Sequence, residues 1–380
     1  MKKRGGVINL LAYKRFNTIL DFLEKEEIIV YNKILKLEKI KLDRIKKKEF
    51  KFPEDIFPLE NSPIEWWYFS GHLKSGKKKF GIEFCFFKVN PGAIRMGVIP
   101  LNLLKKEPFL VLHQAITDKD KKKFTYSQKK GVLLENKFRR GLALNLEKES
   151  LVWKNGFSIK SEFFDLFIKP KKKIILHYNH GFKQYKFAPT NRTYYVSFTR
   201  MDTKGFIIQN GKKYPVKGKL WFDHQKSTLP EKQVLWGWDW TGIMLDDGTE
   251  LMVTGLRRQK DFKVADLSGS YITKNSKKVN LKKEEIEFMP LDSWKSEKTG
   301  IIYPSKWNLK IKKLGLDLTI IPCVKNQELD FVLSAGVSYW EGACEVSGKK
   351  NRRKIKGEAY VELVGYDTRL LSKFIRKLGL

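Results

Sequence analysis

The sequence of 380 residues is poor in cysteine and lacks the motifs of cofactor chemistry. Its three cysteines, Cys85, Cys323 and Cys344, form no Cys-x-x-Cys pair, which argues against a disulfide framework or a zinc ribbon and favours a reducing compartment. The GxGxxG, P-loop, HExxH and GxSxG fingerprints are also absent. We therefore expect no cofactor and no metal.

The sequence has no long apolar runs. No stretch reaches the roughly 18 to 20 apolar residues of a membrane-spanning helix, so we expect no transmembrane segment. The basic start, Met1 to Arg4, resembles that of a signal peptide, but Lys14 and Arg15 cut the following apolar stretch short, and no small-residue cleavage site follows. These features predict a cytoplasmic protein.

Acidic residues are fewer than basic ones. The 76 Lys and Arg outnumber the 42 Asp and Glu, which leaves a net charge of +34 and favours anionic partners. The lysines are spread widely, however, and the runs at 77–79, 121–123 and 171–173 lie between strand-like segments, where solvated turns are expected. Without a nucleic-acid-binding motif we expect no nucleic-acid partner. Peripheral contact with the anionic inner face of a membrane is the alternative.

The first 52 residues differ from the rest of the chain. Their apolar residues recur at three- and four-residue steps among many lysines, which predicts a basic helical extension over 1–52. Two interpretations stay open: an amphipathic anchor on anionic lipid, or a helical arm packed against the main domain or a partner. Pro53 and Pro58 then end the helical character. A second helical pattern predicts a short C-terminal helix over 367–380.

From residue 63 onward the hydrophobic period is two, and turn pairs such as Ser75-Gly76 and Asn210-Gly211 separate the apolar segments. Strands joined by short polar turns, without intervening helical patterns, indicate antiparallel barrels or sandwiches. The body is therefore predicted to be all-β.

An internal repeat divides this β body into two parts. Trp66-Trp67-Tyr68 is followed by a leucine and a glycine at the same spacing as Trp238-Asp239-Trp240. Near the end of each part, Lys-Gly-x-x-aromatic-apolar-acid occurs at 217–223 and again at 356–362. Because the two motifs keep their order, we expect two related β domains, over 63–230 and 231–366.

The candidate chemistry combines an acid with aromatic rings. In the strand 220–224, Trp221 and Asp223 face one side of the sheet, while Phe222 and His224 face the other. If Trp221 points into a barrel, Asp223 does too, and burial would raise the pKa of its carboxyl into the range of a general acid. The alternative is that Asp223 is a structural acid at a strand end. The histidines of His177-x-x-His180 have no spacing that favours one shared metal.

Further acids and rings surround the repeated motifs. Aromatic rings that line a cavity can hold an apolar ligand or stabilise a carbocation through their negative faces. The candidate ligand-binding residues are Glu65, Trp66, Trp67, Tyr68, Tyr194, Tyr195, Trp238, Trp240, Trp340 and Glu341.

In these segments the chain resembles the AttH-like and carotenoid 1,2-hydratase (hydroxyneurosporene synthase) group. The similarity spans nearly all of residues 63–366. It is carried by EWWYFSGHL at 65–73, HQAITD at 113–118, YYVSFTR at 194–200, WFDH at 221–224, GWDW at 237–240 and YWEG at 339–342. The resemblance implies two tandem lipocalin-like, calycin-type antiparallel barrels. In the hydratase branch it also implies cofactor-independent addition of water to an isoprenoid double bond, with Asp223 as the acid and Trp221 and His224 beside it.

The chain departs from this group at two positions. Gln225 follows the Asp-His pair where an acidic residue is expected, and Trp221 stands where the hydratase branch more often has tyrosine. Two functional hypotheses therefore stay open. One is a hydro-lyase acting on an apolar isoprenoid or lipid-like molecule in a barrel cavity, and the other is a non-catalytic carrier of such a molecule.

Overall fold

The computed structural model describes residues 45–90, 95–96, 99–100, 108–132, 141–228, 235–258, 261–331 and 337–367. Most of the predicted helical extension and the predicted C-terminal helix lie outside these residues. Residues 45–52 run without helix into the short 3-10 helix η1 (Glu54–Ile56), and Ile45 packs in the first core.

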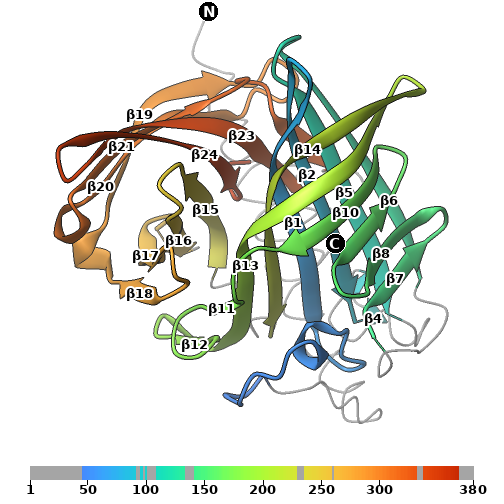
Figure 1. Ribbon diagram of the computed structural model, residues 1–380. Helices are drawn as coiled ribbons and strands as arrows, with labels where there is room; N and C mark the ends of the chain where they lie inside the picture. The colour runs from blue at the N-terminus through green and yellow to red at the C-terminus, as the bar shows by residue number, and fades with distance from the viewer. Residues whose placement is uncertain are drawn as a thin grey trace, which may run out of the picture.

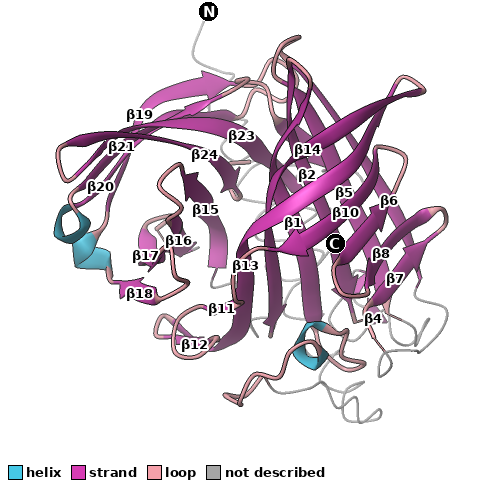
Figure 2. Cartoon of the chain, viewed as in Figure 1, coloured by secondary structure: helices cyan, strands magenta, loops and turns pink. Residues whose placement is uncertain are grey.

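The described strands form two large antiparallel sheets (Figures 1 and 2). The first contains β1 (Ile64–Ser75), β2 (Lys78–Val89), β5 (Phe109–Asp118), β6 (Lys123–Val132), β7 (Ala143–Leu146), β8 (Glu149–Trp153), β9 (Phe157–Lys160), β10 (Phe164–Pro170), β11 (Ile175–Leu176), β12 (Phe182–Tyr185), β13 (Ala188–Gln209) and β14 (Lys212–Ser227). The short strands β3 (Arg95–Met96) and β4 (Ile99–Pro100) pair with each other.

The second sheet contains β15 (Leu235–Leu245), β16 (Glu250–Arg258), β17 (Val264–Ile272), β18 (Lys278–Leu281), β19 (Glu287–Lys295), β20 (Ile302–Ile311), β21 (Leu316–Pro322), β22 (Glu328–Phe331), β23 (Val337–Lys350) and β24 (Arg353–Leu363). Two further 3-10 helices, η4 (Lys283–Glu285) and η5 (Lys312–Leu314), connect its strands. The prediction of an all-β protein is confirmed.

The first sheet curls into a nearly closed barrel. Its strand order runs β6-β5-β2-β1-β14-β13-β10-β9-β8-β7, and the two end strands approach each other, because a Cβ added to Gly131 of β6 would collide with Leu146 of β7. Alternate residues of each strand fill the interior. Phe69, Phe84 and Phe222, from three neighbouring strands, lie fully buried there.

The internal repeat corresponds to a repeated topology. The first strand of each sheet pairs with the last: β1 with β14, and β15 with β24. Gly76 and Gly248 occupy the turns after β1 and β15 with φ of 57° and 82°, a left-handed conformation that glycine adopts without strain. Gly218 and Gly357 of the second motif allow close approach, because a Cβ on either would collide with a backbone carbonyl of the paired strand.

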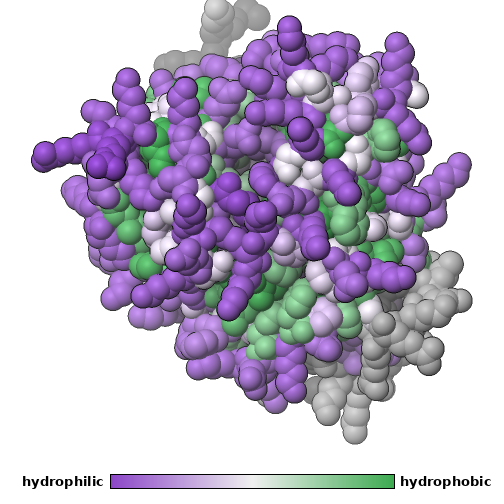
Figure 3. Space-filling view, viewed as in Figure 1, coloured by the Kyte–Doolittle hydropathy of each residue, from purple (hydrophilic) through white to green (hydrophobic). Residues whose placement is uncertain are grey.

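The two sheets pack face to face. Strand β1 lies against β24, β2 against β23 and β13 against β15 (Figure 1). Glycine permits the closest contact, because a Cβ added to Gly81 of β2 would collide with the Cβ of Ala343 on β23. Strands β1, β2 and β14 are therefore covered on both faces, by the core of their own barrel and by the second sheet. Elsewhere, hydrophilic side chains dominate the face seen in Figure 3, with hydrophobic ones in smaller patches.

Candidate active site

The facing surfaces of the two sheets enclose a layer of aromatic and acidic side chains, which we call the inter-sheet layer. Because successive side chains of a strand point to opposite faces, the residues of the docked strands that do not enter the core of their own sheet point toward the opposite sheet. Its rings include Tyr68, Tyr195, Trp221, Trp240 and Tyr360, and the Trp240 ring lies 5.4 Å from that of Tyr68 and 6.0 Å from that of Trp221, between centroids. Its acids are Glu83, Asp223, Glu341 and Glu362.

Asp223 lies in this layer, on β14, and accepts three hydrogen bonds. Tyr195 Oη donates to Oδ2 at 2.7 Å, Trp221 Nε1 donates to Oδ1 at 2.6 Å, and Ser197 Oγ also donates to Oδ1. Trp240 Nε1 from the second sheet donates to Tyr195 Oη at 2.9 Å, so both sheets contribute to the network. Asp223 is 4% exposed, and among the described residues no Lys, Arg or His forms an ion pair with it.

Burial raises the pKa of Asp223 from 3.8 to about 7, although its three hydrogen bonds act in the opposite direction. Loss of hydration disfavours the ionised carboxyl, and neutral donors offset that cost only in part. A carboxyl with this pKa is present in both protonation states near neutral pH. Such a group can both donate and accept a proton during a reaction.

The pKa values of the other three acids of the layer are also raised. Burial raises the pKa of Glu362 to about 7, with smaller contributions from the charges of Asp223 and Asp239 and an opposing effect of a hydrogen bond from Trp238. Burial, Glu362 and Glu83 together raise the pKa of Glu341 well above its usual range, although Tyr68 Oη donates to Glu341 Oε1 at 2.6 Å. Glu341 and Glu362 are direct cross-strand partners. Neighbouring like charges of this kind cannot all ionise at neutral pH.

A buried histidine continues the Asp223 network toward the second sheet. His177 Nε2 lies 2.7 Å from Ser197 Oγ, and His177 Nδ1 lies 3.0 Å from Ser270 Oγ on β17. Because the Ser197 hydroxyl donates its proton to Asp223, its oxygen accepts from Nε2–H, and Nδ1 then accepts from Ser270. Burial lowers the pKa of His177 to about 3, so the ring is neutral. Asp223, Ser197, His177 and Ser270 thus form one hydrogen-bonded chain.

The structure brings most of the candidate residues together. Trp221 and Asp223 share the face turned toward the second sheet, and neither points into the interior of the first barrel. The layer or its edge also contains Trp66, Tyr68, Tyr195, Trp238, Trp240 and Glu341.

Five candidates lie elsewhere. Trp340 belongs to the core of the second sheet, and Trp67 and Tyr194 belong to the core of the first barrel. His224 and Glu65 lie on the same face as Trp67, where the Glu65 carboxylate faces Lys88 at 3.3 Å and Lys226 at 3.7 Å and accepts the Leu59 N–H at 2.8 Å. His224 stacks on Trp67 and bonds the Trp66 carbonyl, and burial lowers its pKa well below 6.5. None of these five side chains is hydrogen-bonded to Asp223, whose partners are Tyr195, Ser197 and Trp221.

A family model of AttH-like proteins matches residues 44–366, most of the chain. The chain belongs to the AttH-like family. Among solved structures, an AttH of Nitrosomonas europaea matches with a TM-score of 0.72 and 24% identity over 85% of this chain and 99% of its own. Kievitone hydratase of Nectria haematococca matches with a TM-score of 0.62 and 15% identity over 84% and 94% of the two chains. At these identities the likeness shows a shared lipocalin-like fold, and no curated protein matches the chain in sequence.

The family assignment confirms the resemblance found in the sequence. Within the described part of this AttH-like chain, no group of three or more His, Cys, Asp or Glu side chains could hold a metal ion. No helix among the same residues is long and apolar enough to cross a membrane. His180, the second member of the histidine pair, is not bonded to the Asp223 network, whereas His177 is.

Sequence reasoning missed several members of the layer. Glu83 lies between Ile82 and Phe84 on β2, and its carboxyl oxygen Oε2 is buried without a hydrogen bond. The sequence could have indicated this position, because successive residues of a strand face opposite sides, so Glu83 and Cys85 lie on the face opposite to Phe84. Ser197 and His177 gave no local signal, since their role depends on pairing between strands distant in the sequence.

Proposed function

We propose that this AttH-like protein is a cofactor-independent hydratase that adds water to a carbon–carbon double bond of an apolar isoprenoid or lipid-like molecule, with Asp223 as the general acid. The observation that carries the proposal is a carboxyl of pKa about 7, unpaired with any cation of the described chain and surrounded by rings. The proposal differs from the sequence expectation in placing the reaction between the sheets instead of inside a barrel.

The chemistry needs only these groups. The π electrons of the alkene take the proton of Asp223 at the less substituted carbon, which leaves a tertiary cation and the Asp223 carboxylate. The faces of nearby rings and this carboxylate stabilise the cation electrostatically. Water then adds to the cation, and its surplus proton returns to the Asp223 carboxylate. Hydrogen and hydroxyl are added in total, and the acid is regenerated.

The edge of the layer offers an approach for an apolar ligand. Trp66, Phe87, Tyr178 and Trp238 pack against the layer while staying half-buried. Partly exposed aromatic side chains of this kind supply large apolar contact areas to a ligand. The name of the similar structure from Nectria, a hydratase, agrees with this reaction class but does not identify a substrate.

The test compares wild-type protein with Asp223→Asn in a host that makes polyenes. Organic extracts of the purified proteins are analysed by mass spectrometry, with Asp317→Asn, an exposed carboxylate on β21, as the matched control. The hydrated product should accompany wild type and the control, and the unconverted alkene should accumulate on Asp223→Asn. Turnover that survives in Asp223→Asn would exclude the mechanism. Equal ligand binding by all three proteins, without product, would instead favour the carrier hypothesis.

A cytoplasmic location and a peripheral contact with an anionic membrane stay predictions. The contact depends on the extension before residue 45, and measuring vesicle binding of the full chain with and without residues 1–44 would test it. We expect removal of residues 1–44 to weaken binding to vesicles that contain anionic lipid and to leave binding to neutral vesicles unchanged.

A further inference from the structure

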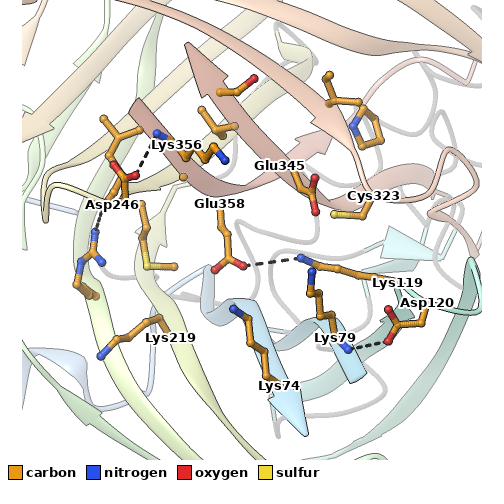
Figure 4. A pocket seen from close by; sticks show the side chains of 18 of the residues that line it. Lys74, Lys79, Lys119, Asp120, Lys219, Asp246, Cys323, Glu345, Lys356 and Glu358 are labelled. Atoms are coloured by element: carbon orange, nitrogen blue, oxygen red, sulfur yellow. Dashed lines mark hydrogen bonds and ion pairs between the residues drawn. The ribbon is translucent and has the colours of Figure 1, made fainter. Parts of the chain in front are cut away.

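A second site lies at the other end of the space between the sheets. There a cavity of about 1020 Å³ is lined by both sheets, and we call it the basic cavity. Its lining includes six lysines: Lys74, Lys79 and Lys219 from strands of the first sheet, Lys119 and Lys122 from the turn after β5, and Lys356 from β24. Figure 4 shows several of them around the Glu358 carboxylate.

Three of these ammonium groups are free to meet a ligand. In the described residues, the side chains of Lys74, Lys79 and Lys356 have no carboxylate partner. Two carboxylates at the rim bond backbone groups instead of these ammonium groups. Asp120 accepts a hydrogen bond from the Lys79 backbone N–H, and Asp246 accepts one from the Lys356 backbone N–H. The cavity therefore presents unpaired positive charge from both sheets.

The arrangement costs stability in the absence of an anion. Lys74 lies directly opposite Lys79 on one side and Lys217 on the other, and like charges at such positions destabilise a sheet. Lys119 is only 7% exposed, yet its carboxylate partner, Glu358, lies 3.8 Å away and is shared with His72. A bound anion would offset the repulsion between the strand lysines and would add a charged partner for Lys119.

We propose that the basic cavity binds a small anion carrying two or more negative charges, of the phosphate-ester or diphosphate class. Lysine binds phosphate as a flexible point charge, and several lysines around one cavity suit a compact multiply charged group. An extended polyanion fits less well, because Asp120, Asp246, Glu345 and Glu358 also line the cavity and would repel it.

This site is distinct from that of Asp223. Glu358 at the cavity and Glu362 in the inter-sheet layer are four residues apart on β24, about 13 Å along an extended strand. The proposal therefore does not depend on hydration chemistry, and charge changes at the cavity leave the network of Asp223 intact.

Calorimetric titration of the full chain with inorganic diphosphate, at one fixed ionic strength, tests the proposal. The double variant Lys74→Gln/Lys356→Gln should bind at least tenfold more weakly than wild type. The matched control Lys148→Gln/Lys283→Gln removes the same charge from exposed positions, in the turn after β7 and in η4, and should bind as wild type does. Lys74→Gln should also raise the melting temperature without ligand, because it removes a repulsion, so weaker binding cannot be attributed to misfolding.

The source of the anion is identified by a second titration series. If geranyl diphosphate binds more tightly than diphosphate while geraniol does not bind, the site takes the anionic head of an amphiphile. Equal affinity for diphosphate and geranyl diphosphate assigns it to a free phosphate compound. Absence of saturable diphosphate binding by wild type, or equal weakening in the two double variants, would overturn the proposal.

Discussion

Replacing Asp223 by Asn should stabilise the protein in a strongly pH-dependent way. The amide has nearly the same shape as the carboxyl and can meet the same neighbours, since the Tyr195 and Ser197 hydroxyls can rotate to accept hydrogen bonds from it. The substitution therefore removes mainly the ability of residue 223 to ionise. The size of the effect follows from the difference between the folded and unfolded pKa values.

The sign and magnitude follow from linkage. Below pH 3.8 the carboxyl is protonated in both states, so it costs nothing. As pH rises, it ionises first in the unfolded chain, and the folded state loses stability until the pH passes the folded pKa of about 7. The destabilisation is about 2 kcal/mol at pH 5 and about 4 kcal/mol at pH 8. Asp223→Asn should therefore gain about 2 kcal/mol relative to wild type between these two pH values.

Urea unfolding followed by tryptophan fluorescence gives the free energy of unfolding at each pH without adding salt. The quantity to compare is the difference between variant and wild type, because all other titrating groups then cancel. Asp317→Asn, which changes an exposed carboxylate, should give a difference that is nearly constant with pH.

If the free energy of unfolding of Asp223→Asn differs from that of wild type by the same amount at pH 5 and at pH 8, the reasoning is refuted. That result would mean that Asp223 titrates alike in the folded and unfolded chain, so that its burial does not favour the protonated form. The general-acid proposal would then lose its support before any substrate is known. The expected result, conversely, would show that lost turnover in this variant is not lost folding.

Three further variants test the packing described above, each by urea unfolding. Gly81→Ala should cost about 1–3 kcal/mol by forcing the sheets apart, and adding Ala343→Gly should restore most of that loss. His177→Phe should cost about 1–3 kcal/mol, because it leaves two buried serines without their partner. Glu65→Gln should cost about 3–5 kcal/mol, because it removes the negative charge that faces the buried ammonium groups of Lys88 and Lys226, whereas Glu287→Gln at an exposed ion pair should cost under about 1 kcal/mol.

Much of the architecture could be predicted from the sequence. Period-two segments predicted strands, and Gly76 and Gly248 marked turns that the structure places in the left-handed region. The repeated motifs lie in strands with a repeated pairing, since the first strand of each sheet pairs with the last. These features are local, so the sequence displays them directly.

The orientation of the candidate site could not be predicted in the same way. Period two tells which residues share a face, but not whether that face is the barrel interior or its outer surface. On β2 both faces are apolar, with Phe84 on one and Cys85 on the other, because both are covered. Strands buried on two sides lose the polar and apolar alternation that marks the inside. Asp223 was therefore recognised as an acid among rings, while its position between the sheets was not.

The repeat also explains why the site forms where it does. Asp223 and Glu362 occupy equivalent positions in the two copies of the second motif, as do Tyr68 and Trp240 in the first. The sheets dock through the strands that carry these motifs, and Asp223 and Glu362 are buried between the sheets, which raises the pKa of both to about 7. In an isolated barrel the same acid would face water and ionise in the usual range. The perturbed carboxyls thus depend on the contact between the two sheets, and so does the acid–base chemistry that we propose for them.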